Sequence, residues 1–223
     1  MNWIDIHTHF DTVTPDVISV RNYIFGLENI ESSTYFSVGV HPWYLHYSLD
    51  QFEHLLTDIR YNPRFVAVGE CGMDFRKNYL KLFSKQLQQE IFIRQILQAE
   101  NLQKPLIIHC VKCFDRLIYL KNSISTTIPW IVHGYSKNEI LLNQLLEAGF
   151  YVSFGVHFFK SKRNRQALKS IPINRLFFET DEQDFFDIKT VYQKAAEVKQ
   201  MDIQVLKKQI KKNFERIFLI KTV

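Results

Sequence analysis

The sequence predicts an α/β fold: a parallel sheet, open or closed into a barrel, within a single domain covering residues 1–223. Two observations support this. Short apolar runs rich in β-branched and aromatic residues alternate with longer amphipathic stretches, as expected of strands that helices cover on both faces. The 223 residues include only 7 glycines and 6 prolines, which excludes collagen-like and loop-dominated chains. A (β/α)8 barrel usually needs about 250 residues, so the barrel expected here is compact.

Seven apolar runs are predicted as strands, and an eighth strand is less regular. The seven are residues 3–6, 35–40, 65–68, 105–108, 130–132, 150–154 and 176–178, and the eighth is residues 17–25. The amphipathic stretches predict helices at residues 49–60, 79–101, 113–121, 138–148, 163–169, 188–199 and 203–220. Residues 10–34 lack the clean helix that a complete second βα unit would supply, so we expect that unit to be reduced or remodelled.

Charge and composition narrow the class of protein. The 28 basic and 23 acidic residues give a net charge of +5, which permits a phosphate-bearing partner without requiring one. We expect Lys207, Lys208, Lys211 and Lys212 on the exposed side of the last helix. No apolar run reaches the roughly 18 residues of a membrane span, and the N-terminus lacks the features of a signal peptide. The expectation is a cytoplasmic protein without a membrane partner, and no obligate protein partner is indicated.

The three cysteines are Cys71, Cys110 and Cys113. An odd number in a chain without a secretion signal predicts free thiols. The spacing of Cys110 and Cys113 fits half a zinc site or a redox pair, but no second cysteine pair accompanies them. Small buried apolar side chains are the favoured interpretation.

Histidines and carboxylates gather where the predicted strands end. The residues concerned are His7, His9, His41, Glu70, His109, His133 and Asp181. In a parallel barrel the carboxyl ends of all strands share one rim, where active sites are found. Single histidines there can be core residues paired with a carbonyl, and Asp181 can cap a helix. Several histidines and carboxylates together instead predict a metal site.

The spacing of His7 and His9 places both imidazoles on the same side of a strand, where they can bind one cation. A buried carboxylate at Glu70 can bridge two cations, and Asp181 can bind a metal and accept the proton of an attacking water. The group as a whole suggests a binuclear site with the metals about 3.5–4 Å apart. Nitrogen and oxygen ligands suit Zn²⁺ or Mn²⁺, and Mg²⁺ with a shell richer in oxygen.

The motifs resemble those of the TatD family of metal-dependent hydrolases, commonly described as deoxyribonucleases. The resemblance rests on DIHTH (5–9), GVHP (39–42), GECGMD (69–74), PLIIHC (105–110), HGYS (133–136) and ETD (179–181). It implies a TIM-like (β/α) barrel of the metal-dependent hydrolase type. It also implies that the metal ligands are His7, His9, Glu70, His109, His133 and Asp181, with Glu70 bridging. The implied reaction is metal-assisted hydrolysis of a phosphodiester, with DNA as the leading substrate.

Three features depart from the family pattern. Val111 stands where the family usually has a basic residue, and Lys112 follows it. Glu182 stands where a proline usually follows the ETD motif, and residues 10–34 are much shorter than the family's corresponding region. These departures concern the choice of substrate rather than metal binding.

Several cations and rings are candidates for substrate contacts. Lys162 and Arg163 belong to a run of basic residues over 160–165, which fits a phosphate site or a solvated loop. Arg76 and Lys112 are further phosphate candidates, and His41 is a candidate substrate contact. Trp43 can stack on a base, although packing under a loop is the favoured role.

The function predicted is hydrolysis of phosphodiester bonds, most readily DNA, by a binuclear site. Asp181 and Glu70 are the predicted catalytic residues, and two divalent cations are the predicted cofactors. One alternative is a metal-dependent hydrolase that cleaves an ester, amide or lactone in a small molecule. An alternative of another class is a non-catalytic nucleic-acid-binding barrel with structural metals.

Overall fold

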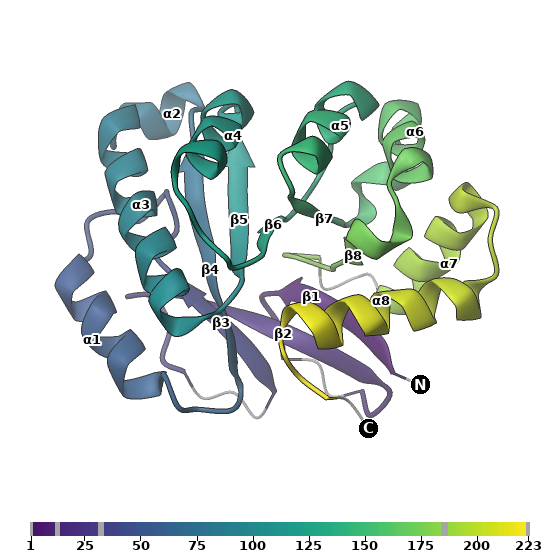
Figure 1. Ribbon diagram of the computed structural model, residues 1–223, viewed down its shortest axis with the longest axis horizontal. Helices are drawn as coiled ribbons and strands as arrows, with labels where there is room; N and C mark the ends of the chain where they lie inside the picture. Colours follow the sequence, from purple (N-terminus) through teal and green to yellow (C-terminus); the bar gives the residue numbers. More distant parts are fainter. Residues whose placement is uncertain (1, 12–13, 31–33, 184–186, 222–223) are drawn as a thin grey trace. The chain divides into compact units, whose positions relative to one another are not determined.

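The computed structural model describes residues 2–11, 14–30, 34–183 and 187–221, coloured along the chain in Figure 1. The chain divides into two compact units. Unit 1 consists of Met1–Arg21 and Ile131–Val223, and unit 2 consists of Asn22–Trp130. The boundaries fall inside two strands, β2 (Val17–Ile24) and β6 (Trp130–Val132).

Unit 1 contains strands that are short and run parallel. They are β1 (Trp3–Thr8), β7 (Tyr151–Phe154) and β8 (Leu176–Phe178), with the unit's parts of β2 and β6. Ile131 pairs with Tyr151 and Ser153 with Phe177, while Ile4 pairs with Ile18. A bridge between Thr8 and Asp181 joins the end of β8 to β1, so the order within this unit is β6, β7, β8, β1, β2.

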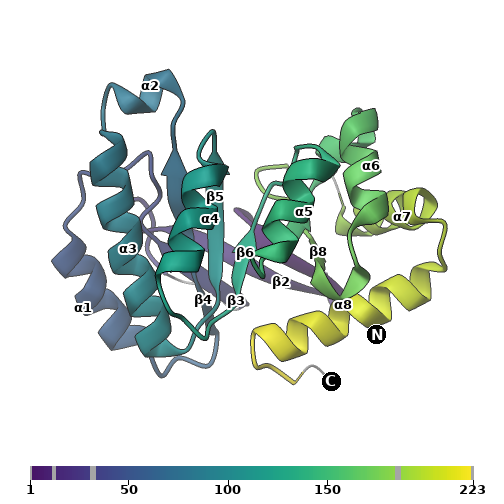
Figure 2. The ribbon, with the colours of Figure 1, turned by 45° about the horizontal axis from the view of Figure 1, so that its top comes forward.

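The helices of unit 1 begin at side chains that accept a hydrogen bond from the first helical turn, as N-caps do. They are α5 (Glu139–Glu147), α6 (Lys162–Ser170), α7 (Ile188–Lys199) and α8 (Ile203–Ile217), capped by Asn138, Ser161, Asp187 and Asp202. Two short 3₁₀ helices, η1 (Val156–Phe159) and η2 (Ile173–Arg175), precede α6 and β8. Helices α7 and α8 pack on β1 and β8 (Figure 2).

Lys207 of α8 corrects one prediction. It was expected on the exposed side of the last helix, but only 7% of it is exposed. Its Nζ lies 3.7 Å from the centroid of the Trp3 ring, a cation–π contact between α8 and β1. The long aliphatic stem packs while the ammonium group finds the ring face, so a lysine can point inward from an amphipathic helix.

Unit 2 contains three further parallel strands covered by helices. The strands are β3 (Tyr35–Gly39), β4 (Phe65–Asp74) and β5 (Leu106–Val111). The helices are α1 (Leu49–Ile59), α2 (Lys77–Leu80), α3 (Lys85–Leu102) and α4 (Phe114–Ser123). Helix α3 packs on β4. Two buried amides fix it there: Gln95 bonds the N–H and carbonyl of Val40, and Gln88 bonds those of Asp74.

The predicted strands and helices are largely confirmed, with two main differences. Strand β4 runs six residues beyond the predicted end at residue 68, because the carboxylates it carries, Glu70 and Asp74, are buried against the ring nitrogens of His109 on β5 rather than excluded from the sheet. The helix predicted over 79–101 is divided into α2 and α3, with Ser84 capping α3. Among described residues 25–30 and 34, between β2 and β3, there is no helix, so the second βα unit is reduced as predicted. Residues 12–13 and 31–33 of that region lie outside the described residues.

Within the part of the chain that the structure describes, no helix combines the length and the apolar character that crossing a bilayer demands.

Candidate metal centre

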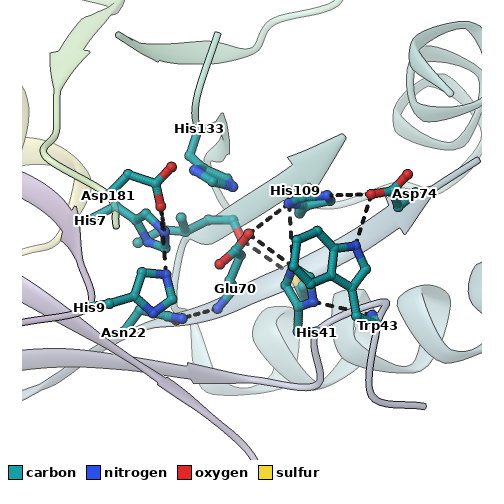
Figure 3. Close-up of polar contacts among 12 residues, drawn as sticks. His7, His9, Asn22, His41, Trp43, Glu70, Asp74, His109, His133 and Asp181 are labelled. Atoms are coloured by element: carbon teal, nitrogen blue, oxygen red, sulfur yellow. Dashed lines mark hydrogen bonds and ion pairs between the residues drawn. The ribbon is translucent and has the colours of Figure 1, made fainter. Parts of the chain in front are cut away.

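In unit 2, His109 lies between two buried carboxylates (Figure 3). Its Nδ1 is 2.8 Å from Oε1 of Glu70, and its Nε2 is 3.2 Å from Oδ2 of Asp74. His109 comes from β5, whereas both carboxylates come from β4. The two strands therefore place a histidine between two carboxyl groups.

The strand register explains this arrangement. His109 pairs with Gly72, which lies two residues from Glu70 on one side and two residues from Asp74 on the other. Side chains two residues apart on a strand point to the same side, so both carboxylates flank the imidazole. Gly72 has φ +138°, and a Cβ placed there would lie 2.1 Å from the carbonyl oxygen of His109. Only glycine allows β4 and β5 to approach this closely.

His41 completes the cluster in unit 2. Its Nε2 lies 3.2 Å from Oε1 of Glu70 and 3.4 Å from Nδ1 of His109. One ligand atom from each of these three residues lies within 4.8 Å of the others. The substrate contact suggested for His41 stays a prediction, and only 3% of the residue is exposed.

Asp74 is surrounded by donors. Its carboxylate accepts hydrogen bonds from the indole of Trp43 and from the guanidinium and backbone N–H of Arg76, and its Oδ2 also lies 3.2 Å from Nε2 of His109. Burial raises the pKa of Asp74, but the hydrogen bonds from His109, Arg76 and Trp43 outweigh it and hold the pKa well below its ordinary value. Asp74 is therefore an ionised, fully hydrogen-bonded carboxylate.

Unit 1 carries a second cluster of the same chemical type. Oδ1 of Asp181 lies 3.5 Å from Nε2 of His7 and 3.6 Å from Nε2 of His9 (Figure 3). The His133 ring centroid is 4.3 Å from that of His7. His7, His133 and Asp181 each offer a ligand atom within 4.8 Å of the others. The structure thus brings together four predicted ligands within this unit.

Backbone pairing positions Asp181. Its N–H donates to the carbonyl of His7 at 2.9 Å, and its carbonyl accepts from the N–H of His9 at 3.2 Å. Asp181 itself adopts φ +56°, which turns the chain at the end of β8. The backbone of Asp181, the predicted proton acceptor, is therefore hydrogen-bonded to the backbones of the two predicted histidine ligands.

Two further carboxylates are buried in unit 1. Asp5 accepts hydrogen bonds from the hydroxyl of Thr180 at 2.7 Å and from the backbone N–H groups of His7 and Thr180. Burial raises the pKa of Asp5 to about 7, against the lowering effect of these hydrogen bonds. Oε1 of Glu179 accepts from the N–H of Gly134 and lies 3.7 Å from Nδ1 of His133. Asp5 and Glu179 therefore support the loops that carry the cluster.

Three of the predicted substrate contacts lie at the surface. Lys112 directly follows β5 and is exposed, and Lys162 and Arg163 are exposed in the first turn of α6. Arg76 is half-buried and donates Nε and Nη2 to Asp74, while its guanidinium lies over the rings of Trp43 and Tyr79. Arg76 thus has a structural partner that sequence reasoning did not identify.

Trp43 and the cysteines have packing roles. The ring of Trp43 stacks on Tyr79 with centroids 4.6 Å apart and 3° between planes, as the packing interpretation predicted. All three cysteines are free and buried. The Sγ atoms of Cys110 and Cys113 lie 3.2 Å apart, and burial raises the pKa of the Cys110 thiol well above its ordinary value. Free, buried thiols agree with the prediction.

The donor sets fit divalent cations. Each cluster combines imidazole nitrogens with a carboxylate, the set preferred by Zn²⁺ and Mn²⁺. His109 provides a specific indication, because both its nitrogens face carboxylate oxygens. An imidazole donates from both nitrogens only as a cation, whereas a metal ion at one nitrogen would satisfy the same carboxylates.

Sequence reasoning missed the residues behind the predicted ligands. Asp74 and Glu179 stand in the quoted motifs 69–74 and 179–181, next to predicted ligands. Their presence in these motifs was the signal by which the sequence could have identified them. Their roles depend on which ring nitrogen they face, and only the structure shows this.

Comparison with known proteins places the chain in a family. The sequence profile of the TatD related DNase family matches residues 19–219. An uncharacterized metal-dependent hydrolase of Buchnera aphidicola is 31% identical over 180 residues, covering 78% of this chain and 66% of that protein. A protein of Yersinia pseudotuberculosis named 3'-5' ssDNA/RNA exonuclease TatD is 30% identical over 65% of this chain and 56% of its own length. This chain thus matches less than two thirds of either relative.

A solved structure, the TatD homologue YJJV of Escherichia coli, is similar with a TM-score of 0.82 and 21% sequence identity. The similarity covers 98% of each chain and confirms the predicted TIM-like (β/α) barrel fold. Since the family profile covers most of the sequence, the chain belongs to the TatD related DNase family.

Proposed function

We propose that this chain is a metal-dependent hydrolase that cleaves phosphodiester bonds, with DNA as its substrate. The observation that supports it is the pair of histidine–carboxylate clusters, His7/His133/Asp181 in unit 1 and His41/Glu70/His109 in unit 2. A zinc ion with a structural role needs only one closed set of four ligands. Two separate clusters are more than such a role requires.

Each cluster would hold one divalent cation, which gives two cations per chain. His9 would join His7 and Asp181, whose carboxylate it approaches to 3.6 Å. The bridging role expected of Glu70 stays a prediction. When bound, the cations supply Lewis-acid stabilisation of negative charge and lower the pKa of a coordinated water. The ligand types favour Zn²⁺ or Mn²⁺ over Mg²⁺.

Asp181 is the residue suited to accept the proton of the attacking water. Its side chain is 30% exposed, whereas that of Glu70 is 5% exposed and that of Asp74 is fully buried. A proton acceptor needs access to water, and only Asp181 among these three has it. The neighbouring imidazoles of His7 and His9 hold the carboxylate in place.

Exposed cations would hold the phosphates of the substrate. Lys112 stands one residue after Val111, and Lys162 and Arg163 are exposed at the start of α6. Positive charge at a helix N-terminus opposes the helix dipole, so the placement of Lys162 and Arg163 has no local structural benefit. The name of the Yersinia relative supports a nucleic-acid substrate for this chain as well.

The test is a substrate panel with a matched pair of variants. The purified chain is treated with a chelator, supplied with Mn²⁺, Zn²⁺ or Mg²⁺, and offered labelled single-stranded DNA, RNA, a phosphomonoester and a carboxyl ester. We expect metal-dependent cleavage of DNA that Asp181→Ala abolishes. Glu182→Ala, the exposed neighbour, should retain it.

Three outcomes would contradict the proposal. Cleavage confined to carboxyl esters would indicate a small-molecule hydrolase. Salt-sensitive DNA binding without cleavage would indicate a nucleic-acid-binding protein. Unchanged turnover in Asp181→Ala would remove Asp181 from the mechanism.

A further inference from the structure

We propose that Asp74 is a positioning residue that fixes the ring of His109, so that Nδ1, rather than Nε2, is the atom presented to a cation. This inference rests on the proposed function, because it assigns His109 as a metal ligand. Of the candidate substrate contacts, Asp74 touches Arg76 and Trp43.

The first step is that Asp74 can act only as an acceptor. Its partners Trp43 Nε1, Arg76 Nε and Nη2, and the Arg76 backbone N–H are all pure donors. A carboxylate already occupied by such donors has no proton to give to His109. The 3.2 Å contact between Nε2 of His109 and Oδ2 of Asp74 is then a hydrogen bond that His109 donates.

The second step follows from the chemistry of imidazole. A neutral ring that carries its proton on Nε2 has its lone pair on Nδ1. In this structure Nδ1 faces Oε1 of Glu70 at 2.8 Å and Nε2 of His41 at 3.4 Å. Asp74 therefore directs the lone pair of His109 towards the other two members of the cluster.

The third step is that Asp74 is itself held rigidly. Gln88 of α3 accepts the N–H of Asp74 at 2.7 Å and donates to its carbonyl at 3.1 Å. The Arg76 guanidinium closes the other side, packed against the rings of Trp43 and Tyr79. Such built support behind a histidine ligand is what tunes metal affinity in other metal sites, where its loss typically weakens binding 10–100-fold.

The variant that tests this is Asp74→Asn. An asparagine can turn its NH₂ group towards Nε2 of His109, which favours the proton on Nδ1 and blocks the lone pair. Zinc is titrated into the chain against a chromophoric chelator. We expect one of two binding steps to weaken by about 10–100-fold and the other to stay unchanged. Asp58→Asn, an exposed aspartate of α1, is the matched control and should change neither step.

A second measurement does not depend on the variant folding. Nitrogen-15 NMR of the histidine rings in the unchanged, zinc-loaded chain should show His109 with its proton on Nε2. A proton on Nδ1 overturns the inference.

The outcomes separate this inference from the proposed function. If the unchanged chain binds no zinc, this inference is overturned, whereas the proposed function is overturned only if Mn²⁺ and Mg²⁺ also fail to support cleavage. If the unchanged chain binds zinc, and Asp74→Asn lowers only the melting temperature while both binding steps persist, Asp74 has a purely structural role and only this inference is overturned.

Discussion

Replacing Gly72 by alanine should move His109 away from its two carboxylate partners, Glu70 and Asp74. The new Cβ would lie 2.1 Å from the carbonyl oxygen of His109, and real Cβ atoms essentially never come within 3.0 Å of a neighbour. Strands β4 and β5 would then have to separate by about 0.9 Å at this position. Because His109 is on β5 and its carboxylate partners are on β4, the 2.8 and 3.2 Å contacts would both exceed hydrogen-bond length.

The energetic cost has two parts. Alanine at φ +138° carries about 1–3 kcal/mol of backbone strain, and forced overpacking adds about 1–3 kcal/mol. The total of about 2–6 kcal/mol corresponds to a fall in melting temperature of roughly 5–20 °C for a chain of this length. A displacement of about 1 Å at a catalytic group can also reduce turnover about 100-fold.

Gly149→Ala is the matched control. Gly149 has φ +86°, but nothing lies within 4 Å of the Cβ that it would gain, so this variant carries backbone strain without a clash. Calorimetry and zinc titration are done on both variants. We expect both to lose stability and only Gly72→Ala to lose zinc affinity. If Gly72→Ala binds zinc within twofold of the unchanged chain, the close approach of β4 and β5 does not position His109.

Three further predictions concern stability. Removing divalent metal should lower the melting temperature. Zinc at about 100 times its dissociation constant should then raise the free energy of unfolding by about 2.7 kcal/mol, which corresponds to roughly 5–10 °C in melting temperature by scanning fluorimetry. The absence of a shift would contradict metal binding. Lys199 donates hydrogen bonds to the carbonyls of Leu168, Lys169 and Ile171 at the end of α6. Lys199→Met should therefore lower the free energy of unfolding, measured in urea, by about 2–4 kcal/mol. Lys194→Met in the same helix should lower it by less than about 0.5 kcal/mol, because Lys194 is paired only at the surface. Burial lowers the pKa of Lys104 below its ordinary 10.5, so above the lowered value the unfolded state binds more protons than the native state. The free energy of unfolding should therefore rise with pH up to about 10.5 relative to Lys104→Met, and a parallel pH profile would refute this.

The sequence predicted most of the fold because the strands are continuous apolar runs. It ended β4 too early, since Glu70 and Asp74 look like loop residues when their partners are unknown. Strand length here depends on hydrogen-bond partners contributed by β5 and α3, which are 35 and 14 residues away from Asp74 in the chain. Hydrophobic patterns carry no information about such pairings.

The sequence predicted most of the residues that make up the candidate site, but not which of them contact one another. The predicted ligands His7, His9, His133 and Asp181 lie together in unit 1, and Glu70 and His109 lie together in unit 2. The place of His41 in the second cluster depends on the turn after β3, which brings its Nε2 within 3.2 Å of Glu70. A strand-end histidine can face inward or outward at such a turn, so residue order alone could not decide its role.

The pattern of hydrogen bonds separates two kinds of carboxylate, and the same division occurs in each unit. In unit 1, Asp5 is occupied by the Thr180 hydroxyl and two backbone N–H groups, whereas Asp181 faces the rings of His7 and His9. In unit 2, Asp74 is occupied by indole, guanidinium and backbone donors besides its contact with Nε2 of His109, whereas Glu70 faces the rings of His41 and His109.

A carboxylate occupied by fixed donors cannot turn to a cation without breaking several hydrogen bonds, which costs about 1–3 kcal/mol for each buried donor left unsatisfied. A carboxylate that faces imidazoles forms with them a set of ligands that suits a divalent cation, and the bound cation would stabilise its negative charge. Asp5 and Asp74 are therefore suited to hold the frame of each cluster, and Asp181 and Glu70 to bind metal. This division follows from the identity of the donors and does not depend on the family to which the chain belongs.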